Sequence, residues 1–413
     1  MRKFITLFST LFFILTIPSF SFGGKETYKP TVIVDSSFWA SEEDQKFIVE
    51  EILKPFAKRN ASIAAFTAMD DNSILDRAEI QKITENQTTN LVIANVQYFD
   101  QWVSGEYADD LTADMANLSD RTISPGVNPL ILTYNAQHFI PLVSDVYLLC
   151  ANVKALDFLP AETDVQDLTW EQFVNWTIAV AKSEGTGKVT LAGASGAGLI
   201  YQIAAVALAY GASFPDVSSD GAAKAWNVML EMKNAYAPNV ETYSDVAVPM
   251  KSGEAWITWT HIDTAKSLYE SEPERFIVAP VPRGPKGRGS VIDMYGIGIP
   301  ADTPNRGLSL KLIEYFTSSS VSLEIARNTG VWIPPISELN DKLKDIARDK
   351  VIDQAINVFD NGALAFVPLE YVVAGNWKLV ALAYDDIAAK LYTAGKVDRE
   401  YLAEMQTKID TYK

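Results

Sequence analysis

Short apolar runs alternate along the chain with stretches in which apolar positions recur every three or four residues. The run from Thr31 to Val34 is β-branched and predicts a buried strand, and a helix with acidic residues in its first turn is predicted to begin at Ser41. Leu91 to Ala94 predicts a second buried strand. Further strands are predicted over residues 189–192, 276–281 and 295–299.

Helices are predicted between and after these strands. Thr169 and Gln172 have the spacing of a capping box, which predicts that a helix begins there. Apolar residues at helical spacing cover residues 308–316 and 377–391, and Gly395 is predicted to end the second of these helices. Because strands and helices alternate, the predicted fold class is α/β, with sheets flanked by helices.

The first 23 residues have the pattern of a secretory signal peptide. Two basic residues come first, positions 4–20 are mostly apolar, and small residues follow at positions 21–23. No later apolar stretch reaches the roughly 18 to 20 residues that span a bilayer. The only cysteine, Cys150, is remote from the cleavage point, so neither a lipid anchor nor an intrachain disulfide is expected. We therefore expect a periplasmic or otherwise extracytoplasmic protein.

The length of the chain predicts two lobes. Of its 413 residues, about 390 would remain after the signal peptide is removed, whereas one hydrophobic core rarely serves more than about 250 to 300 residues. The apolar content of 48% is sufficient for two cores. The segment 280–289 is rich in glycine and proline and predicts either a connection between the lobes or a surface hairpin.

Charge limits the classes of partner. The chain carries 52 acidic and 35 basic residues, a formal net charge of −17, which argues against binding to nucleic acids or anionic lipids. An uncharged or cationic ligand is favoured instead.

Few residues have the spacing that enzymes or cofactors require. With two histidines and one cysteine, the chain predicts no transition-metal site, and its glycines fit neither a dinucleotide fingerprint nor a phosphate-binding loop, so no cofactor is expected. The sequence 193–197 lacks the last glycine of a nucleophile elbow. A secreted glycosidase remains an alternative, but its two carboxylates would have to face each other across a sugar bond, which adjacent acidic pairs do not do.

The aromatic residues point to a ligand with flat apolar faces. Nine tryptophans and 17 tyrosines are a high content, and sugars stack their C–H faces on such rings. Trp170, Trp176 and Trp226 fall within helical patterns and are expected to pack in cores. Tryptophans close to strand ends, where α/β sheets bind ligands, are the better candidates; they are Trp39, Trp256, Trp259 and Trp332.

An ordered set of segments resembles one known family. These segments are Pro141–Asn152 with its proline, acid and later asparagine, Leu168–Phe173, Lys251–Ala255 followed by Trp-Ile-Thr, Tyr295–Pro300, Asn328–Pro334, and the helix that Asn376-Trp377 opens. In this order they resemble the extracellular solute-binding proteins of ABC importers, in particular the sugar-binding branch that includes maltose-binding protein. The resemblance covers nearly the whole chain after the signal peptide.

The resemblance implies a two-lobed periplasmic-binding-protein fold of type II. Lobe one would comprise residues 28–139 plus 287–330, and lobe two residues 140–286 plus 331–413. The implied function is that of a monomeric, non-enzymatic binding protein that holds a carbohydrate between the lobes and delivers it to the permease subunits of an ABC transporter. A polyamine, a peptide or another cation in the same fold remains an alternative.

The same resemblance implies a set of ligand-binding residues. Asp145 falls where relatives place a carboxylate for sugar hydroxyls, Trp377 where they place a stacking ring, and Trp259 or His261 near a stacking position of lobe two. Two departures leave the sugar open: the segment 35–39 lacks the charged residue of maltose-binding protein, and Cys150-Ala151 replaces an aromatic residue. The full set of expected ligand-binding residues is Trp39, Asn95, Gln97, Asp145, Trp259, His261, Tyr295, Trp332 and Trp377.

Overall fold

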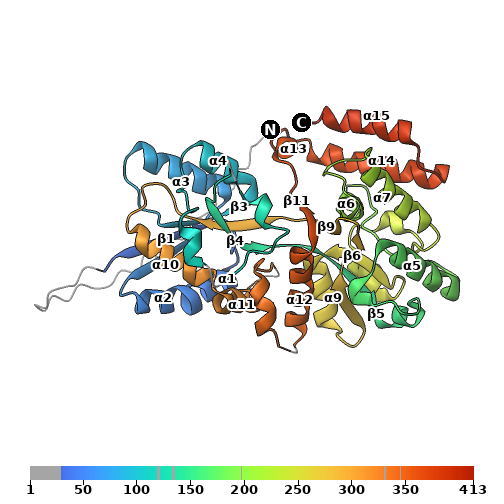
Figure 1. Ribbon diagram of the computed structural model, residues 1–413, viewed down its shortest axis with the longest axis horizontal. Coiled ribbons are helices and arrows are strands. Elements are labelled where there is room, and N and C mark those ends of the chain that lie inside the picture. The colour runs from blue at the N-terminus through green and yellow to red at the C-terminus, as the bar shows by residue number, and fades with distance from the viewer. Residues whose placement is uncertain (1–28, 119–120, 133–134, 197, 330–331, 345) are drawn as a thin grey trace, which may run out of the picture.

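The computed structural model describes residues 29–118, 121–132, 135–196, 198–329, 332–344 and 346–413. The predicted signal peptide at residues 1–23 lies outside these ranges. The described chain forms a mixed α/β structure with its sheets in two lobes, as predicted (Figure 1).

The first lobe is built on a five-stranded sheet. Its strand order is β2-β1-β3-β10-β4, in which β1 is parallel to β2 and β3 while β10 is antiparallel to β3 and β4. The strands are β1 (Thr31–Ser36), β2 (Ile63–Ala68), β3 (Leu91–Asn95), β4 (Phe139–Ser144) and β10 (Met294–Gly298). The chain therefore returns to this sheet with β10 after nearly 150 residues in the second lobe.

Helices cover both faces of this sheet. Along β3, Val92 and Ala94 pack with α3 and α4 in one apolar cluster, whereas Leu91 and Ile93 pack with the helices of the other face in a second cluster. A strand buried on both faces is apolar at every position, which explains the continuous run that predicted it. The helices are α1 (Glu42–Phe47), a π-helical stretch (Ile48–Leu53), α2 (Lys54–Arg59), α3 (Asp71–Ile83), α4 (Phe99–Ser104), α10 (Arg306–Phe316) and α11 (Ser319–Asn328).

The second lobe contains two three-stranded sheets. One has the order β6-β5-β7 and the other β11-β9-β8. The strands are β5 (Tyr147–Asn152), β6 (Ile257–His261), β7 (Phe276–Pro280), β8 (Arg283–Gly284), β9 (Gly287–Val291) and β11 (Gly362–Ala365). The antiparallel pair β8 and β9 confirms a hairpin within residues 280–289.

Most of the remaining chain is helical and belongs to this lobe (Figure 1). The helices are α5 (Trp170–Glu184), α6 (Leu199–Ala209), α7 (Asp220–Glu231), α8 (Ala247–Ser252), α9 (Ile262–Ser271), α12 (Ala347–Asp360), α13 (Leu369–Val373), α14 (Trp377–Ala394) and α15 (Arg399–Asp410). Short 3-10 segments lie at Val96–Tyr98, Asp114–Leu118, Asn128–Leu130, Val153–Phe158, Val165–Asp167, Val240–Thr242 and Ser337–Lys342.

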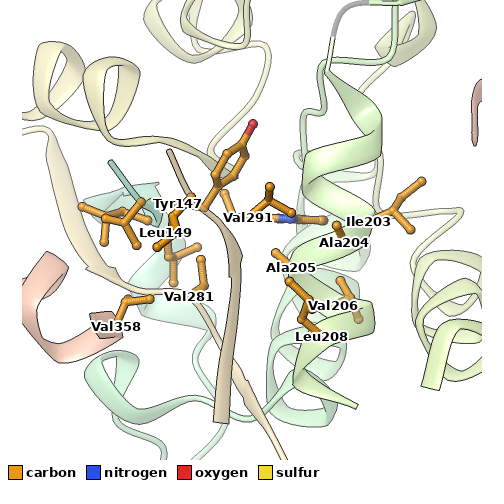
Figure 2. Packing of buried hydrophobic residues seen from close by; sticks show 14 of the residues in the cluster. Tyr147, Leu149, Ile203, Ala204, Ala205, Val206, Leu208, Val281, Val291 and Val358 are labelled. Carbon is orange, nitrogen blue, oxygen red and sulfur yellow. The ribbon is translucent and has the colours of Figure 1, made fainter. Parts of the chain in front are cut away.

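The core of the second lobe forms where α6 lies against β9 (Figure 2). Ala204, Ala205 and Leu208 of α6 are buried there together with Val291. Close approach requires glycine on the strand, because a Cβ at Gly289 would lie 1.9 Å from the carbonyl oxygen of Ala205. Replacing Gly289 with any larger residue is thus expected to separate the helix from the sheet.

Local signals located most helix ends correctly. Thr169 and Gln172 form a complete capping box at the start of α5, and Gly395 ends α14 with φ 69°. The helical tryptophans Trp170, Trp176 and Trp226 are buried as predicted.

The strand predicted at residues 189–192 is wrong. Only Val189 makes bridges, to Tyr236 and Ile257, and the segment then continues as irregular chain. The segment is buried although it forms no strand: the backbone N–H groups of Val189 and Thr190 donate to the carbonyl oxygens of Ala235 and Ile257. An apolar run can therefore indicate burial without indicating a β-strand.

Within the described residues, three chain segments pass between the lobes. The first joins β4 to β5 at Asp145, the second joins β9 to β10 at Asp293, and the third runs beside Ser144, whose backbone exchanges hydrogen bonds of 2.9 and 2.8 Å with Ile333. These crossings lie close to the predicted lobe boundaries, and the exact boundaries stay a prediction.

Candidate functional site

The first two crossing segments are tied together by reciprocal hydrogen bonds. The backbone N–H of Asp145 donates to the carbonyl oxygen of Asp293 at 3.1 Å, and the backbone N–H of Asp293 donates to Asp145 Oδ1 at 2.5 Å. The Ser144 hydroxyl donates to the same Asp293 carbonyl at 2.8 Å. Because Asp145 is 7% exposed, these bonds are shielded from water and hold the crossings in register.

The other carboxylate oxygen of Asp145 faces the second lobe. Asp145 Oδ2 lies 2.5 Å from His261 Nε2, at the end of β6. Burial alone would lower the pKa of His261, but its hydrogen bonds with Asp145 and Asp263 and the charges of those residues outweigh burial and raise the pKa to about 10. The imidazole is therefore protonated at neutral pH and pairs with Asp145 as an ion.

Asp293 lies on the lobe-one side of this pair. Its Oδ1 accepts hydrogen bonds from Asn95 Nδ2 at 2.9 Å and from the backbone N–H of Met294 at 2.8 Å. Burial, followed by the negative charge of Asp145, raises the pKa of Asp293 to about 6. A chain of polar contacts therefore runs from Asn95 at the end of β3, through Asp293 and Asp145, to His261 at the end of β6.

A third carboxylate, Asp71, adjoins Asn95. Asp71 Oδ1 accepts from the backbone N–H of Asn95 at 2.8 Å and from the Ser37 hydroxyl at 2.7 Å. Burial is the largest cause that raises the pKa of Asp71 above its ordinary value. The crossings are thus acidic as well as polar.

One aromatic cluster stands on the lobe-one side of the carboxylates. It consists of Phe38, Tyr295 and Trp332, with ring centroids 4.7 to 5.4 Å apart, and all three rings are half-buried. Burial raises the pKa of Tyr295 to about 12, and the charges of Asp71 and Asp293 contribute. We call this set the Tyr295 cluster.

A second aromatic cluster stands on the lobe-two side. Trp377 Nε1 donates to the Tyr201 hydroxyl at 2.9 Å, and the rings of Tyr147 and Phe214 lie 6.3 and 6.4 Å from the Tyr201 ring. The Tyr147 ring also meets His261 edge-on at 6.0 Å. Burial raises the pKa of Tyr201, and the charges of Asp145 and Asp293 add to it, so this cluster is also close to the carboxylates. We call this set the Trp377 cluster.

The expected residues divide into two groups. Asn95, Asp145, His261, Tyr295 and Trp377 are brought together around the crossings, with Trp332 in the Tyr295 cluster and Gln97 half-buried on the turn after β3.

Trp39 and Trp259 lie instead in the cores of the two lobes. Trp39 is 2% exposed, donates to Thr329 Oγ1 at 3.3 Å and stacks on Phe316. Trp259 is fully buried, donates to the carbonyl oxygen of Gln202 at 2.8 Å and packs edge-on against Trp170 and Phe173. Neither ring has a surface left for a ligand in this conformation.

Sequence reasoning missed four members of the site: Phe38, Tyr147, Tyr201 and Asp293. Tyr147 is the first residue of β5 and is 9% exposed. Its hydroxyl has no hydrogen-bond partner among the described residues, and Figure 2 shows that this hydroxyl points away from the aliphatic core. The sequence did contain a signal for Asp293, an acid between two apolar strands, and for Tyr201, which with Gln202 is one of two polar residues in a helix that is otherwise apolar.

No group of three or more histidine, cysteine, aspartate or glutamate side chains is placed to hold a metal ion in the described ranges. No helix that the structure describes is long and apolar enough to cross a membrane.

Comparison with known proteins identifies the fold and the family. Residues 51–354 match the family described as bacterial extracellular solute-binding protein. No curated protein sequence matches the chain.

Several solved structures share the fold. The sugar-binding protein MalE from the phytopathogen Xanthomonas citri has a TM-score of 0.72 at 15% identity, covering 92% of this chain and 97% of that one. Maltose-bound MalE3 of T. maritima has a TM-score of 0.61 at 17% identity, with 92% and 99% covered. The cyclic α-maltosyl-1,6-maltose binding protein of Arthrobacter globiformis has a TM-score of 0.67 at 12% identity, with 93% and 99% covered.

Proposed function

Because the chain belongs to the bacterial extracellular solute-binding proteins, we propose that it is the substrate-binding component of an ABC importer, that it captures a carbohydrate between its lobes, and that it delivers this ligand to the membrane permease. The observation that carries the proposal is the placement of the Tyr295 cluster and the Trp377 cluster, from different lobes, beside the Asp145–Asp293 pair. Structural relatives that bind maltose or cyclic maltosyl sugars support the same ligand class.

The chemistry of the site suits a sugar. The rings of Trp377 and Trp332, both half-buried, offer apolar faces for the C–H surface of a pyranose. Hydroxyl groups need both donors and acceptors. Asp293 supplies an acceptor and Tyr147 a hydroxyl with no protein partner in the described chain.

Capture would proceed by closure of the two lobes about the three crossings. A ligand that touches rings of both lobes binds the closed arrangement better than the open one, and it therefore shifts the population towards closure. A micromolar dissociation constant corresponds to about −8 kcal/mol. A few stacked rings and several hydrogen bonds can reach that value after the cost of association.

The remaining parts of the proposal follow from the family and the sequence. Membership in this family implies an extracytoplasmic location. We propose export by the signal peptide at residues 1–23, no lipid anchor, and action as a monomer without catalysis.

A second candidate ligand is an organic cation such as a polyamine or a basic peptide. The observation that favours it is the gathering of three carboxylates, Asp71, Asp145 and Asp293, between aromatic rings. Protonated His261 neutralises Asp145 in this structure. A dicationic ligand would have to compete with that imidazolium, whereas a neutral sugar would not, which is why the carbohydrate is the primary proposal.

Calorimetric titration with two ligand panels distinguishes these candidates. One panel contains mono- and oligosaccharides and the other contains diamines and polyamines, and the reaction mixtures are analysed for sugar cleavage. Saccharide binding without cleavage, together with a smaller radius of gyration in solution scattering, is expected. Binding of amines alone would replace the primary proposal with the second candidate, and cleavage of the sugar would show a glycosidase.

A further inference from the structure

A cavity lies at the end of β5 that is remote from the crossings. Strand β5 runs from Tyr147 in the Trp377 cluster to Asn152, five residues further on, which is about 16 Å at 3.3 Å per residue. The cavity there has a volume of about 550 Å³ and is lined by, among others, Asn152, Lys154, Lys188, Trp256, Glu274 and Arg275. We call it the distal cavity.

Cationic side chains dominate the lining of the distal cavity. Lys188 Nζ lies 5.1 Å from the centroid of the Trp256 ring, and its one hydrogen bond to a described residue is a long one, 3.4 Å to the carbonyl oxygen of Gly253. Lys154 is exposed and has no ion pair among the described residues. An ammonium group has three donors, so both lysines retain donors for a ligand.

The guanidinium of Arg275, unlike the two lysines, is bonded mainly to other groups of the protein. It donates to the carbonyl oxygens of Met250 and Lys251 at 3.1 and 2.8 Å and to the carboxylate of Glu272 at 3.2 Å. These bonds hold the guanidinium in the wall of the cavity and occupy both of its terminal nitrogens. The charge available to a ligand therefore comes from the two lysines, opposed by the carboxylate of Glu274.

A buried amide adds a directed donor. Asn152 is 3% exposed, and its Oδ1 accepts from the backbone N–H of Lys154 at 3.0 Å, so its Nδ2 is on the other side of the amide group. That nitrogen donates to no group among the residues the structure describes. The nitrogen is not among the enclosed side-chain atoms that lack a partner, so it keeps accessible surface at the cavity that Asn152 lines and can donate to a ligand there.

We propose that the distal cavity is an anion site that binds a phosphate group through Lys154, Lys188 and the amide of Asn152. Lysine is a common phosphate ligand because it provides charge with freely rotating donors. The formal net charge of the chain is −17. A positively charged cavity on this chain therefore cannot be explained by a generally basic surface. For the same reason an anionic membrane would repel the protein, and the expected source is a soluble phosphate compound.

Titration with inorganic phosphate at low ionic strength and pH 7.5 tests the site. Lys188→Gln is expected to weaken phosphate binding at least fivefold. Asn152 caps the 3-10 segment Val153–Phe158. Asn152→Asp keeps this cap, because aspartate caps as well as asparagine, but it replaces the donor with a negative charge and is expected to abolish binding. Glu274→Gln is expected to strengthen binding about threefold, since it removes the opposing charge. Lys182→Gln, an exposed lysine on α5 outside the cavity, is the charge-matched control and should leave the affinity unchanged.

Flotation with vesicles separates the two sources of phosphate. Vesicles of phosphatidylcholine with and without phosphatidylglycerol are compared for the parent chain and for Lys188→Gln. Phosphate binding that depends on Lys188 and Asn152, with no vesicle binding, supports a soluble ligand. Binding only to phosphatidylglycerol vesicles, lost in Lys188→Gln, supports the same site with a lipid headgroup as its ligand. The absence of both, or phosphate affinities that are equal in all four variants, overturns the proposal.

Discussion

The two ends of strand β5 differ in charge and in the way their polar groups are satisfied. At the Tyr147 end, Asp145 is bonded on both carboxylate oxygens, by Asp293 and His261, and aromatic rings surround the group. At the Asn152 end, lysines and an amide retain free donors, and Trp256, the aromatic residue among those that line the distal cavity, is 9% exposed. A single strand thus separates an acidic aromatic site that is already internally paired from a cationic site that is not.

The difference has a consequence for substitutions. Removing a member of the paired network leaves its partner buried without compensation, whereas removing a lysine at the open end leaves no such partner. Removing Asp145 at the Tyr147 end should therefore reduce stability and ligand affinity together, whereas substitutions of the charged residues at the Asn152 end should change anion binding without that loss of stability. The following predictions test this contrast, beginning with the largest expected effect.

Asp145→Ala should have the largest effect. It leaves protonated His261 and the N–H of Asp293 without their acceptor in a buried place, at a cost of about 3 kcal/mol in the free energy of unfolding. Urea denaturation measures this loss. Asp263→Ala, which removes the more exposed and more distant carboxylate beside His261, is the control and should cost less than about 1 kcal/mol. Equal losses in the two variants would contradict the paired network.

The pH dependence of stability should reveal Asp293. Its folded-state pKa of about 6 is above the ordinary value of 3.8, so the folded chain binds the proton more tightly than the unfolded chain does. The contribution of Asp293 is therefore fully present below about pH 4 and is lost as pH rises through 6, by on the order of 2 kcal/mol.

The measurement is the difference in unfolding free energy between the parent chain and Asp293→Asn at pH 4.5, 6 and 7.5. The asparagine variant should gain relative stability across this interval.

His261 should give a second pH dependence of stability, at higher pH. Its folded-state pKa of about 10 exceeds the ordinary value of 6.5, so its contribution to stability is present below pH 6.5 and is lost as pH rises through 10. His261→Gln, compared with the parent chain at further pH values from 7.5 to 10, should remove that dependence. A parent-minus-variant difference that is constant with pH would refute either assignment.

Trp377→Ala should weaken ligand binding by about 1.5 kcal/mol, or more than tenfold, because the ring that would stack on the sugar is lost. Titration of whichever ligand the panels identify measures the effect. Tyr315→Ala provides a half-buried aromatic control on α10, outside both clusters, and should leave the affinity unchanged. An unaltered affinity in Trp377→Ala would exclude the Trp377 cluster from the binding site.

The smallest expected effect is that of Lys188→Gln on the affinity for the ligand that is proposed to bind between the lobes. Since the distal cavity lies at the other end of β5, this substitution should change that affinity by less than twofold. The same titration compares the variant with the parent chain. A larger change would show that the two ends of the strand are coupled.

Signals that are local in sequence located the helices and strands well. The capping box of Thr169 and Gln172, the stop at Gly395 and the buried strand at residues 91–94 depend on a few neighbouring residues, and the structure confirms them. The strand at 189–192 failed because a run of apolar residues indicates burial, and burial does not require a sheet neighbour along the whole run.

Position near a strand end was a weaker signal for the site. It selected Trp332, which lies in the Tyr295 cluster, but it selected Trp39 and Trp259 equally, and these two lie in cores. Side chains at a strand end can turn towards the cleft or into a core, and the choice depends on neighbours such as Phe316 or Trp170 that are distant in the chain.

By itself the sequence determined the α/β class, the two-lobed plan and the family resemblance. The spacing of apolar residues, the helix caps and the order of the segments can all be recognised from residues that are close together in the chain. Only the tertiary structure decided that Asp293 meets Asp145, that His261 is held as a cation, and that Tyr147 and Tyr201 join Trp377. These contacts join residues more than 50 positions apart. Their energies depend on distance and on exclusion of water, which consecutive residues do not encode.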